Sequence, residues 1–360
     1  MSGRRFAWTL GAIAGIALIV RVAYVLIERR DIVLAGDQYF YHRGANLLVD
    51  GKGFISPFFY DLGQRVQAAE HPPLYLLFLS IPSALGMKSV LVHLLWSCLP
   101  STATVVLVGY LGRAVWSARA GLVAAGIFAV YPNAWAPAGL LQAEVLSMFF
   151  VALSLVLGCR YWRAPSAGRL ALVGVAIGLG ALARSELILL VPLLVAPLAW
   201  KTAARSARDR LVWFGAATAA VIALLMPWSI YNATRFEHPV LLSTQFDALL
   251  AATNCDSVYY GPFAGYYDNN CTKDAYARAG LGSDDDQSEQ SIVFRRAAVE
   301  YATEHAGRWP YVASTRLARS VGLYKADLST RLDIFLETRE SWVAWSALYS
   351  FYALALLAIA

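Results

Sequence analysis

Charge is what this sequence has least of. Only 15% of its 360 residues are Asp, Glu, Lys or Arg, whereas 58% are hydrophobic. An ordinary soluble domain is about 25% charged, so the composition excludes that class. Apolar runs such as "FAWTLGAIAGIALIVRVAYVLI" (6–27) exceed the roughly 20 residues that cross a bilayer. The alternating segments of about ten residues that mark a membrane barrel do not stand out. We therefore expect an α-helical polytopic membrane protein.

Acidic residues are scarce in the short connections between the apolar runs. We predict about eight transmembrane helices, at 7–27, 88–112, 120–136, 138–158, 169–183, 186–200, 211–230 and 342–360. Arg and Lys gather at the N-terminus and in the connections 113–119, 159–168 and 201–210. Basic connections mark the cytoplasmic side of a membrane. The net charge of +6 is thus explained by topology, and we expect no nucleic-acid partner.

This topology predicts three parts. Residues 1–230 form a transmembrane module whose first outer loop is 28–87, and 231–341 form a large extracytoplasmic loop domain. The second part ends in "IVFRRAAVEYATEHAGRWPYVASTRLARSVGLYK" (292–325), which is typical of two amphipathic helices at an interface. Residues 342–360 form the last transmembrane helix. Because this run stops at Ala360 without a polar tail, we expect the sequence to be a piece of a longer protein.

Cysteine is also rare, with four residues in the chain. Cys98 and Cys159 lie in or beside apolar helices, where a buried free thiol is expected. Cys255 and Cys271 lie in the second outer segment. Because disulfides form in oxidising compartments, we expect these two to be bonded.

The unusual polar residues gather on the outer side of the predicted membrane. Ionisable groups at membrane depth cost about 2.5 kcal/mol or more, so these residues are candidates for function. Each has a simpler alternative. Asp37 could be a helix N-cap, His71 an interface histidine fixed by the two prolines after it, and Glu144 with Arg184 a structural ion pair. We place Glu144 about two turns into its helix. Long side chains could instead reach toward water as snorkelling ends: Arg65, Glu186 and Arg235.

Five motifs follow one another in an order that resembles the GT-C membrane glycosyltransferases. They are "GDQYFYHRGANLL…GKGF", "EHPPLYLL", "YPNAWAPAGLLQAEVLS", "GLGALARSELILLVPLL" and "PWSIYNATRFEHPVLLS". The series covers nearly the whole chain and is similar to the family 39-like branch, which includes protein O-mannosyltransferases and aminoarabinose transferases. The resemblance implies a GT-C-like bundle in the cell membrane. It also implies an enzyme that moves a sugar from a polyprenyl-phosphate donor to an extracytoplasmic acceptor.

The resemblance also implies roles for single residues. Asp37 matches the acid of the first outer loop, usually the catalytic base, and His71 stands near the donor phosphate. Glu144 and Arg184 match acidic and basic positions at the outer ends of later helices. Several relatives have Glu where this chain has Gln38, so a second acidic contact is absent. We predict that Arg65 and Arg235 join His71 and Arg184 on the phosphate. The predicted substrate-binding residues are Tyr41, His42, Glu70, Tyr75 and Asn232.

The expected chemistry is one direct displacement with inversion, in which Asp37 takes the proton of the acceptor hydroxyl. Cations hold the developing phosphate charge, and the lipid tail lies between helices. The chemistry requires no cofactor. Asp37 and Glu144 could share Mg²⁺ or Mn²⁺, although no tight metal-ligand spacing is present. The alternatives are a lipid-linked sugar flippase or transporter and a non-catalytic envelope scaffold. The sequence names neither the sugar, the acceptor nor the oligomeric state.

Overall fold

The computed structural model describes residues 1–201 and 206–359, and within these ranges the chain is built from helices. Its only pairing of extended backbone in those ranges is an isolated antiparallel bridge between Ile55 and Gln67. Five residues of the predicted segments lie outside the described ranges: 202–205, in the connection 201–210, and Ala360, at the end of the last predicted span.

The chain divides into two compact units. Unit 1 comprises Met1–Gly53 and Pro72–Trp228, and unit 2 comprises Phe54–His71 and Ser229–Ala360. The segment Phe54–His71 lies in the first predicted outer loop, 28–87. It nevertheless belongs to unit 2, together with the second predicted outer segment, 231–341.

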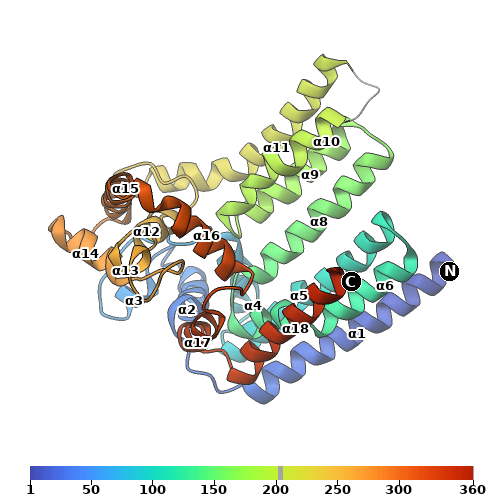
Figure 1. Ribbon diagram of the computed structural model, residues 1–360, viewed down its shortest axis with the longest axis horizontal. Coiled ribbons are helices and arrows are strands. Elements are labelled where there is room, and N and C mark those ends of the chain that lie inside the picture. The colour runs from blue at the N-terminus through green and yellow to red at the C-terminus, as the bar shows by residue number, and fades with distance from the viewer. Residues whose placement is uncertain (202–205, 360) are drawn as a thin grey trace. The chain divides into compact units, whose positions relative to one another are not determined.

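Unit 1 contains most of the apolar helices (Figure 1). Its elements are α1 (Gly3–Glu28), α2 (Gly36–Val49), α4 (Leu74–Ala84), α5 (Val90–Val115), α6 (Ala118–Val130), α7 (Pro132–Trp135), η1 (Ala136–Leu140), α8 (Glu144–Arg163), α9 (Ala167–Ala181), η2 (Ser185–Leu189), η3 (Val191–Val195), α10 (Ala196–Lys201) and α11 (Ala207–Ala233) up to Trp228.

Five helices of the described residues are long and apolar enough to cross a membrane: α1, α5, α8, α11 and α18 (Ser341–Ile359). The apolar helices α6 and α9 are shorter, with 13 and 15 residues. The predicted span 186–200 is divided among η2, η3 and α10. Pro192 lies in η3, where its missing N–H prevents a regular α-helical bond. The fold class expected from the sequence is confirmed, but the count of eight spans is not.

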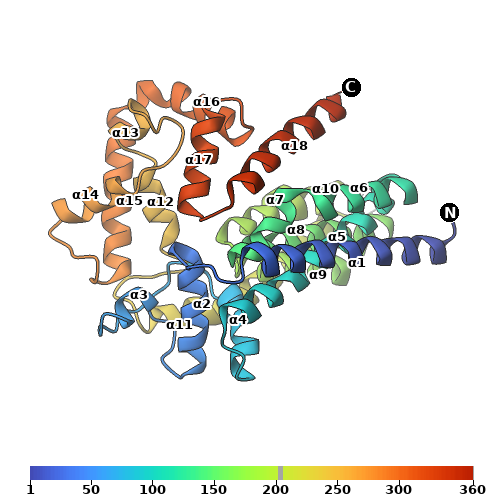
Figure 2. The ribbon, with the colours of Figure 1, turned by 90° about the horizontal axis from the view of Figure 1, so that it is seen from below.

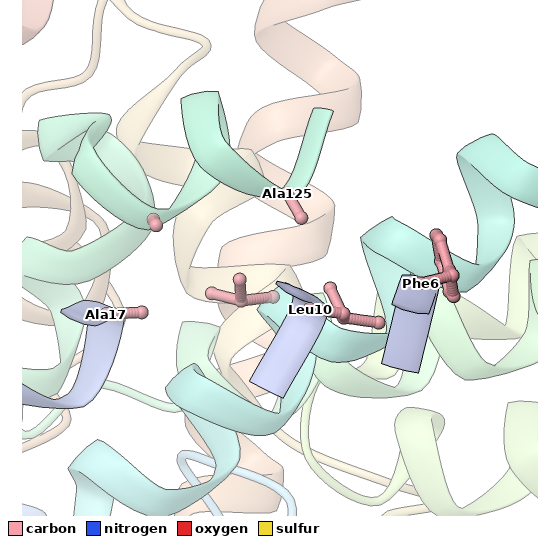
Figure 3. Packing of buried hydrophobic residues seen from close by; sticks show 6 residues of the cluster. Phe6, Leu10, Ala17 and Ala125 are labelled. Carbon is pink, nitrogen blue, oxygen red and sulfur yellow. The ribbon is translucent and has the colours of Figure 1, made fainter. Parts of the chain in front are cut away.

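Small residues bring α1, α5 and α6 close together. Phe6 and Leu10 of α1 lie in one apolar cluster with Ala125 of α6 (Figure 3). A Cβ atom added to Gly121 would lie 2.3 Å from the carbonyl oxygen of Gly109, which is backbone and cannot move aside cheaply. Such small residues allow membrane helices to approach through their backbones.

The chain breaks its helical path before α8. We predicted a span over 138–158, but α6 ends at Val130, and α7 and the 3₁₀ helix η1 follow. Leu141 then adopts a left-handed conformation with φ of 46°. The prediction that Glu144 lies two turns inside its helix is therefore wrong, because Glu144 is the first residue of α8.

Unit 2 contains the helices α3 (Pro57–Tyr60), α12 (Gln245–Ala252), α13 (Asp256–Tyr259), α14 (Asn270–Arg278), α15 (Gln287–Glu304), η4 (Ala306–Arg308), α16 (Trp309–Ser320), α17 (Ala326–Leu336) and α18. Helices α12, α14 and α15 pack together through Ala251, Ala275 and Phe294 (Figure 2). The two amphipathic helices predicted within 292–325 correspond to α15 and α16.

The cysteines follow the expected division. Cys255 and Cys271 are bonded to each other in unit 2. Cys98 is a buried free thiol, and Cys159 is a partly buried one.

Candidate functional site

Ionisable groups of unit 1 gather around the buried hydroxyl of Tyr41 on α2. This side chain is only 1% exposed. Burial raises the pKa of Tyr41 well above its usual value, and the negative charges of Asp37 and Glu144 raise it further, while Arg184 opposes them. The electrostatics therefore place three predicted site residues, Asp37, Glu144 and Arg184, around one neutral hydroxyl.

Arg184 is held between two carboxylates. Its Nη1 lies 3.0 Å from Glu144 Oε1, and its Nε donates to Glu186 Oε1 over 2.9 Å. The ion pair considered as a structural alternative is thus present. The Arg184 side chain is 33% exposed, so the pair is not sealed inside the unit. A guanidinium has five N–H donors, and an arginine oriented by two carboxylates retains the capacity to bind an anion.

Asp37 occupies the first turn of α2 but does not cap it. The N-cap is Ala35, which makes no side-chain capping bond, and Gly36 precedes Asp37 with φ of +52°. The N-cap alternative for Asp37 is therefore wrong. A carboxylate in the first turn is still favoured by the helix dipole, by about 0.3–1 kcal/mol.

Tyr75 has internal partners that differ from the predicted substrate contact. The side chain is fully buried, and its hydroxyl lies 2.8 Å from Ser97 Oγ. Its ring meets the Tyr41 ring edge-on, with the centroids 4.8 Å apart. The geometry gives Tyr75 the role of supporting Tyr41.

His42 faces another histidine rather than an open surface. His42 Nδ1 lies 3.1 Å from His93 Nδ1, and His93 Nε2 lies 2.9 Å from Ser83 Oγ. Ser83 Oγ donates to Asn46 Oδ1 over 2.7 Å, and Asn46 Nδ2 donates to the carbonyl of Lys88 over 3.1 Å. The network ties α2 to the start of α5, so His42 has a structural role instead of the predicted substrate contact.

The hydroxyl proton of Ser83 decides the arrangement of protons in this network. Because Ser83 donates it to Asn46, Ser83 must accept a bond from His93 Nε2. His93 Nδ1 is then the acceptor, and the His42 Nδ1–H donates to it. His42 Nε2 is left as an acceptor 3.5 Å from Asn46 Nδ2. This assignment, inferred from the network, needs two neutral rings.

Arg235 of unit 2 is fully engaged by its own unit. Its Nη1 donates to the carbonyl of Phe54 over 2.6 Å, and its Nη2 donates to the carbonyl of Ala68 over 2.8 Å. Nε and Nη2 both donate to Asn232 Oδ1, over 3.1 and 2.8 Å. The guanidinium also lies over the Tyr231 ring, 4.7 Å from its centroid. These contacts assign Arg235 to holding the segment 54–68 rather than to the predicted phosphate site.

Asn232 is similarly engaged. It is completely buried, it accepts from Arg235, and its Nδ2 donates to the carbonyl of Val240 over 3.1 Å. The predicted substrate contact at Asn232 is therefore replaced by a structural role.

The remaining predicted residues of unit 2 lie along the segment that leads to His71. Glu70 Oε1 accepts from Gln287 Nε2 over 2.8 Å, and Gln287 Oε1 accepts from the amide of Ala69 over 2.9 Å. His71 is buried, with 7% of its surface exposed, whereas Arg65 is exposed. Glu70 thus fixes the backbone just before His71.

Comparison with known proteins finds one matching family and similar solved structures. Residues 70–231 match the family described as dolichyl-phosphate-mannose-protein mannosyltransferase, over somewhat less than half of the chain. The fold is similar to the Archaeoglobus fulgidus oligosaccharyltransferase in its apo form, with 14% identity and a TM-score of 0.52. It is also similar to that enzyme tethered to an acceptor peptide containing the NVT sequon, with 13% identity and a TM-score of 0.51. The chain is thus similar to the GT-C membrane glycosyltransferases in part of its sequence and in its fold.

The match to the archaeal enzyme covers 93% of this chain and 37% of that one. At this identity the likeness concerns the GT-C fold alone. No curated protein matches the sequence. The family segment includes Glu144 and Arg184 and begins just before His71, whereas Asp37 lies ahead of it.

The cavity beside the disulfide of unit 2 is a separate feature. It has a volume of about 470 Å³ and is polar. Its charged lining residues are five acids and one base: Asp256, Asp268, Asp274, Glu300, Glu304 and Arg278. A phosphate would be repelled by this excess of negative charge. We therefore place the candidate site at the group around Tyr41 and not at this cavity.

Sequence reasoning missed two buried arginines of α1. Arg21 is completely buried, and Arg29 is 2% exposed. Arg29 contacts the residue next to Asp37 as well as the segment before Glu144. The position of Arg29 in the sequence could have indicated it. A basic residue at the predicted outer end of a span departs from the positive-inside pattern.

Among residues 1–201 and 206–359, no three His, Cys, Asp or Glu side chains form a group that could hold a metal ion.

Proposed function

We propose that this multi-pass membrane protein transfers a sugar from a polyprenyl-phosphate donor to an acceptor hydroxyl on the extracytoplasmic side. The observation that carries the proposal is the ion pair between Arg184 and Glu144, 3.0 Å long, and the charges of both residues and of Asp37 all affect the pKa of the buried Tyr41 hydroxyl. A carboxylate and a guanidinium are what a displacement at a sugar phosphate needs, and the GT-C fold supplies the membrane setting.

Asp37 acts as the general base. Its carboxylate takes the proton from the acceptor hydroxyl while the hydroxyl oxygen attacks the anomeric carbon. The bond from that carbon to the phosphate oxygen breaks, and the polyprenyl phosphate leaves with the electron pair. A single attack from the opposite face inverts the anomeric centre. A phosphate monoester is a good leaving group, so no strong general acid is required.

Arg184 holds the phosphate as its negative charge develops. A guanidinium can donate two parallel N–H bonds to a phosphate, which fixes the orientation as well as the charge. Glu144 and Glu186 hold the Arg184 side chain in place. In this proposal Glu144 acts through Arg184. His71 and Arg65 remain proposed phosphate contacts, whereas Arg235 does not, because its donors are used within unit 2.

A divalent cation is not required in this proposal. Asp37 and Glu144 are the carboxylates that Mg²⁺ or Mn²⁺ would join, but Glu144 already has a cationic partner in Arg184. The guanidinium therefore supplies the positive charge that a metal would bring.

The test is to incubate the purified protein in lipid nanodiscs with a panel of undecaprenyl-phosphate sugars, including mannose and arabinose forms. Release of undecaprenyl phosphate is followed with and without EDTA. We expect release with one member of the panel, equally fast in EDTA. A flippase would move the donor across a vesicle membrane without release, and that result would replace the proposal.

A further inference from the structure

Arg29 joins three elements of unit 1 at the point where α1 ends. Its backbone is the C-cap of α1 and donates to the carbonyl of Val25 over 3.2 Å. Its side chain continues outward from the helix. Nε donates to the carbonyl of Gly139 in η1 over 2.9 Å, and Nη2 donates to Gln38 Oε1 in α2 over 3.4 Å. One guanidinium thus bonds to two separate segments.

Both partners of Arg29 precede or adjoin a residue of the candidate site. Gln38 follows Asp37 directly in the first turn of α2, and it is buried. Gly139 lies in the 3₁₀ segment that leads through the left-handed Leu141 to Glu144, the first residue of α8. The negative charges of Asp37 and Glu144 both raise the pKa of the Tyr41 hydroxyl.

The close packing at Gly139 is independent evidence that this junction has a fixed geometry. A Cβ atom at Gly139 would lie 2.4 Å from Tyr24 Cε1 and 3.2 Å from Arg29 Cγ. The Tyr24 ring is itself held edge-on against Trp135, with the centroids 4.8 Å apart. The backbone of η1 therefore lies directly against α1, and only glycine leaves room for that contact.

We propose that Arg29 is the positioning residue that fixes the base Asp37 relative to the Glu144–Arg184 pair. This inference rests on the proposed function. Through its bonds to the carbonyl of Gly139 and the amide of Gln38, Arg29 orients both segments. An arginine suits this role because its planar fork presents several donors in fixed directions, whereas a lysine is a single point charge.

Arg21 offers a matched control on the same helix. It is also completely buried, and it also bonds to neutral groups. Its Nε donates to Ser101 Oγ over 2.7 Å, and its Nη1 donates to the carbonyls of Ala17 and Ala129 over 3.0 and 3.2 Å. These partners lie on α1, α5 and α6. Replacing Arg21 therefore disturbs a buried arginine of α1 without touching the segments that carry Asp37 and Glu144.

The experiment compares Arg29→Lys with Arg21→Lys in the full chain, reconstituted in nanodiscs. Three quantities are measured: the melting temperature, hydrogen exchange of the backbone amides at 37–41 and 139–146, and the kcat and KM for the undecaprenyl-phosphate sugar that the wild type uses. We expect both variants to melt at a lower temperature. Only Arg29→Lys should speed exchange in the two segments and lower kcat, by about 10- to 100-fold as expected for a misplaced catalytic group. The donor KM should change by less than about threefold, because Arg184 is untouched.

A second variant protects the test against a failure to fold. Gln38→Ala removes the amide on α2 to which Arg29 donates, and its effect on kcat should not add fully to that of Arg29→Lys if both act through this contact. The proposal is overturned if Arg29→Lys melts earlier but keeps the wild-type kcat, or if Arg21→Lys lowers kcat equally. If no sugar of the panel is used by the wild type, the proposed function fails, while the exchange data still decide whether Arg29 fixes both segments.

Discussion

At the scale of single residues, the partners of Arg184 are consistent with two roles, a structural ion pair and phosphate binding. It is paired with Glu144 and Glu186, yet it keeps one-third of its surface exposed. Arg184→Ala should weaken binding of undecaprenyl phosphate by about tenfold or more, the usual loss for hydrogen bonds to a charged group. Arg184→Lys should recover only part of the affinity, because an ammonium lacks the bidentate fork.

Equilibrium binding to protein in nanodiscs checks this prediction. The melting temperature of each variant is recorded alongside the affinity. If Arg184→Ala lowers the melting temperature, Glu144→Ala added to it restores stability, and the affinity never changes, then the pair is structural only.

His42 leads to a prediction about pH. Burial and, to a smaller extent, the charge of Arg43 together lower the pKa of His42 from its usual 6.5 to about 4. The unfolded chain therefore binds a proton at His42 between about pH 6.5 and pH 4, where the folded chain does not. Unfolding is favoured by that proton uptake, so stability is lost as the pH falls through this window.

We expect the melting temperature of the wild type to fall more between pH 7 and pH 5 than that of His42→Gln. Glutamine can still donate to His93 but does not titrate. Carboxylates that titrate nearby affect both proteins equally, so the difference between the two curves is the quantity to measure. Parallel curves would show that His42 does not contribute to the pH dependence.

At the scale of elements, α6 contains two glycines with opposite surroundings. A Cβ atom at Gly121 would meet the backbone of α5, whereas one at Gly126 would meet nothing within 4 Å. Gly121→Ala should force the two helices apart and cost about 1–3 kcal/mol, as overpacking does. Gly126→Ala should leave stability unchanged or slightly raised, because alanine favours the helix.

Thermal unfolding of the two variants in the same detergent measures this contrast. Equal melting temperatures would mean that α5 and α6 do not approach as closely as the structure shows.

The elements also show what a sequence can predict. The helices α1, α5, α11 and α18 lie where long apolar runs predict them, because length and hydropathy suffice to define a span. The start of α8 was missed, because apolar residues also fill η1 and only the backbone shows the left-handed turn at Leu141. The division of the predicted span 186–200 was missed for the same reason, since its breaks occur within an apolar run.

Charge and position along the chain were enough to predict Asp37, Glu144 and Arg184 as site residues, because an ionisable group near a membrane is rare. The internal partners of His42, Tyr75 and Asn232 could not be predicted, because a sequence does not show that His93, Ser97 or Val240 supplies a partner from elsewhere in the chain. Arg29 was missed for the same reason, since Gly139 and Gln38 supply partners from other segments of the chain.

At the scale of the whole molecule, the proposed function needs one topology. The connections 113–119 and 159–168 should be cytoplasmic, and the segment 231–341 should lie outside. In a background with Cys98 and Cys159 replaced by serine, a cysteine at Ser283 should react with an impermeant maleimide added to intact cells. A cysteine at Ala164 should react only after the cells are opened. Both positions are exposed in the structure. The reverse labelling pattern would remove the basis for a shared extracytoplasmic site.

The central claim is that the charge of Asp37 performs the proton transfer, and Asp37→Asn tests it most directly. Asparagine keeps the size of the side chain and removes only the charge. Because the N-cap of α2 is Ala35, the substitution should leave the helix in place. The variant should insert, fold and bind undecaprenyl phosphate as the wild type does, while release of that phosphate from the donor slows by about 10² or more, the usual contribution of a positioned base. Wild-type turnover in a correctly folded Asp37→Asn protein would contradict the account.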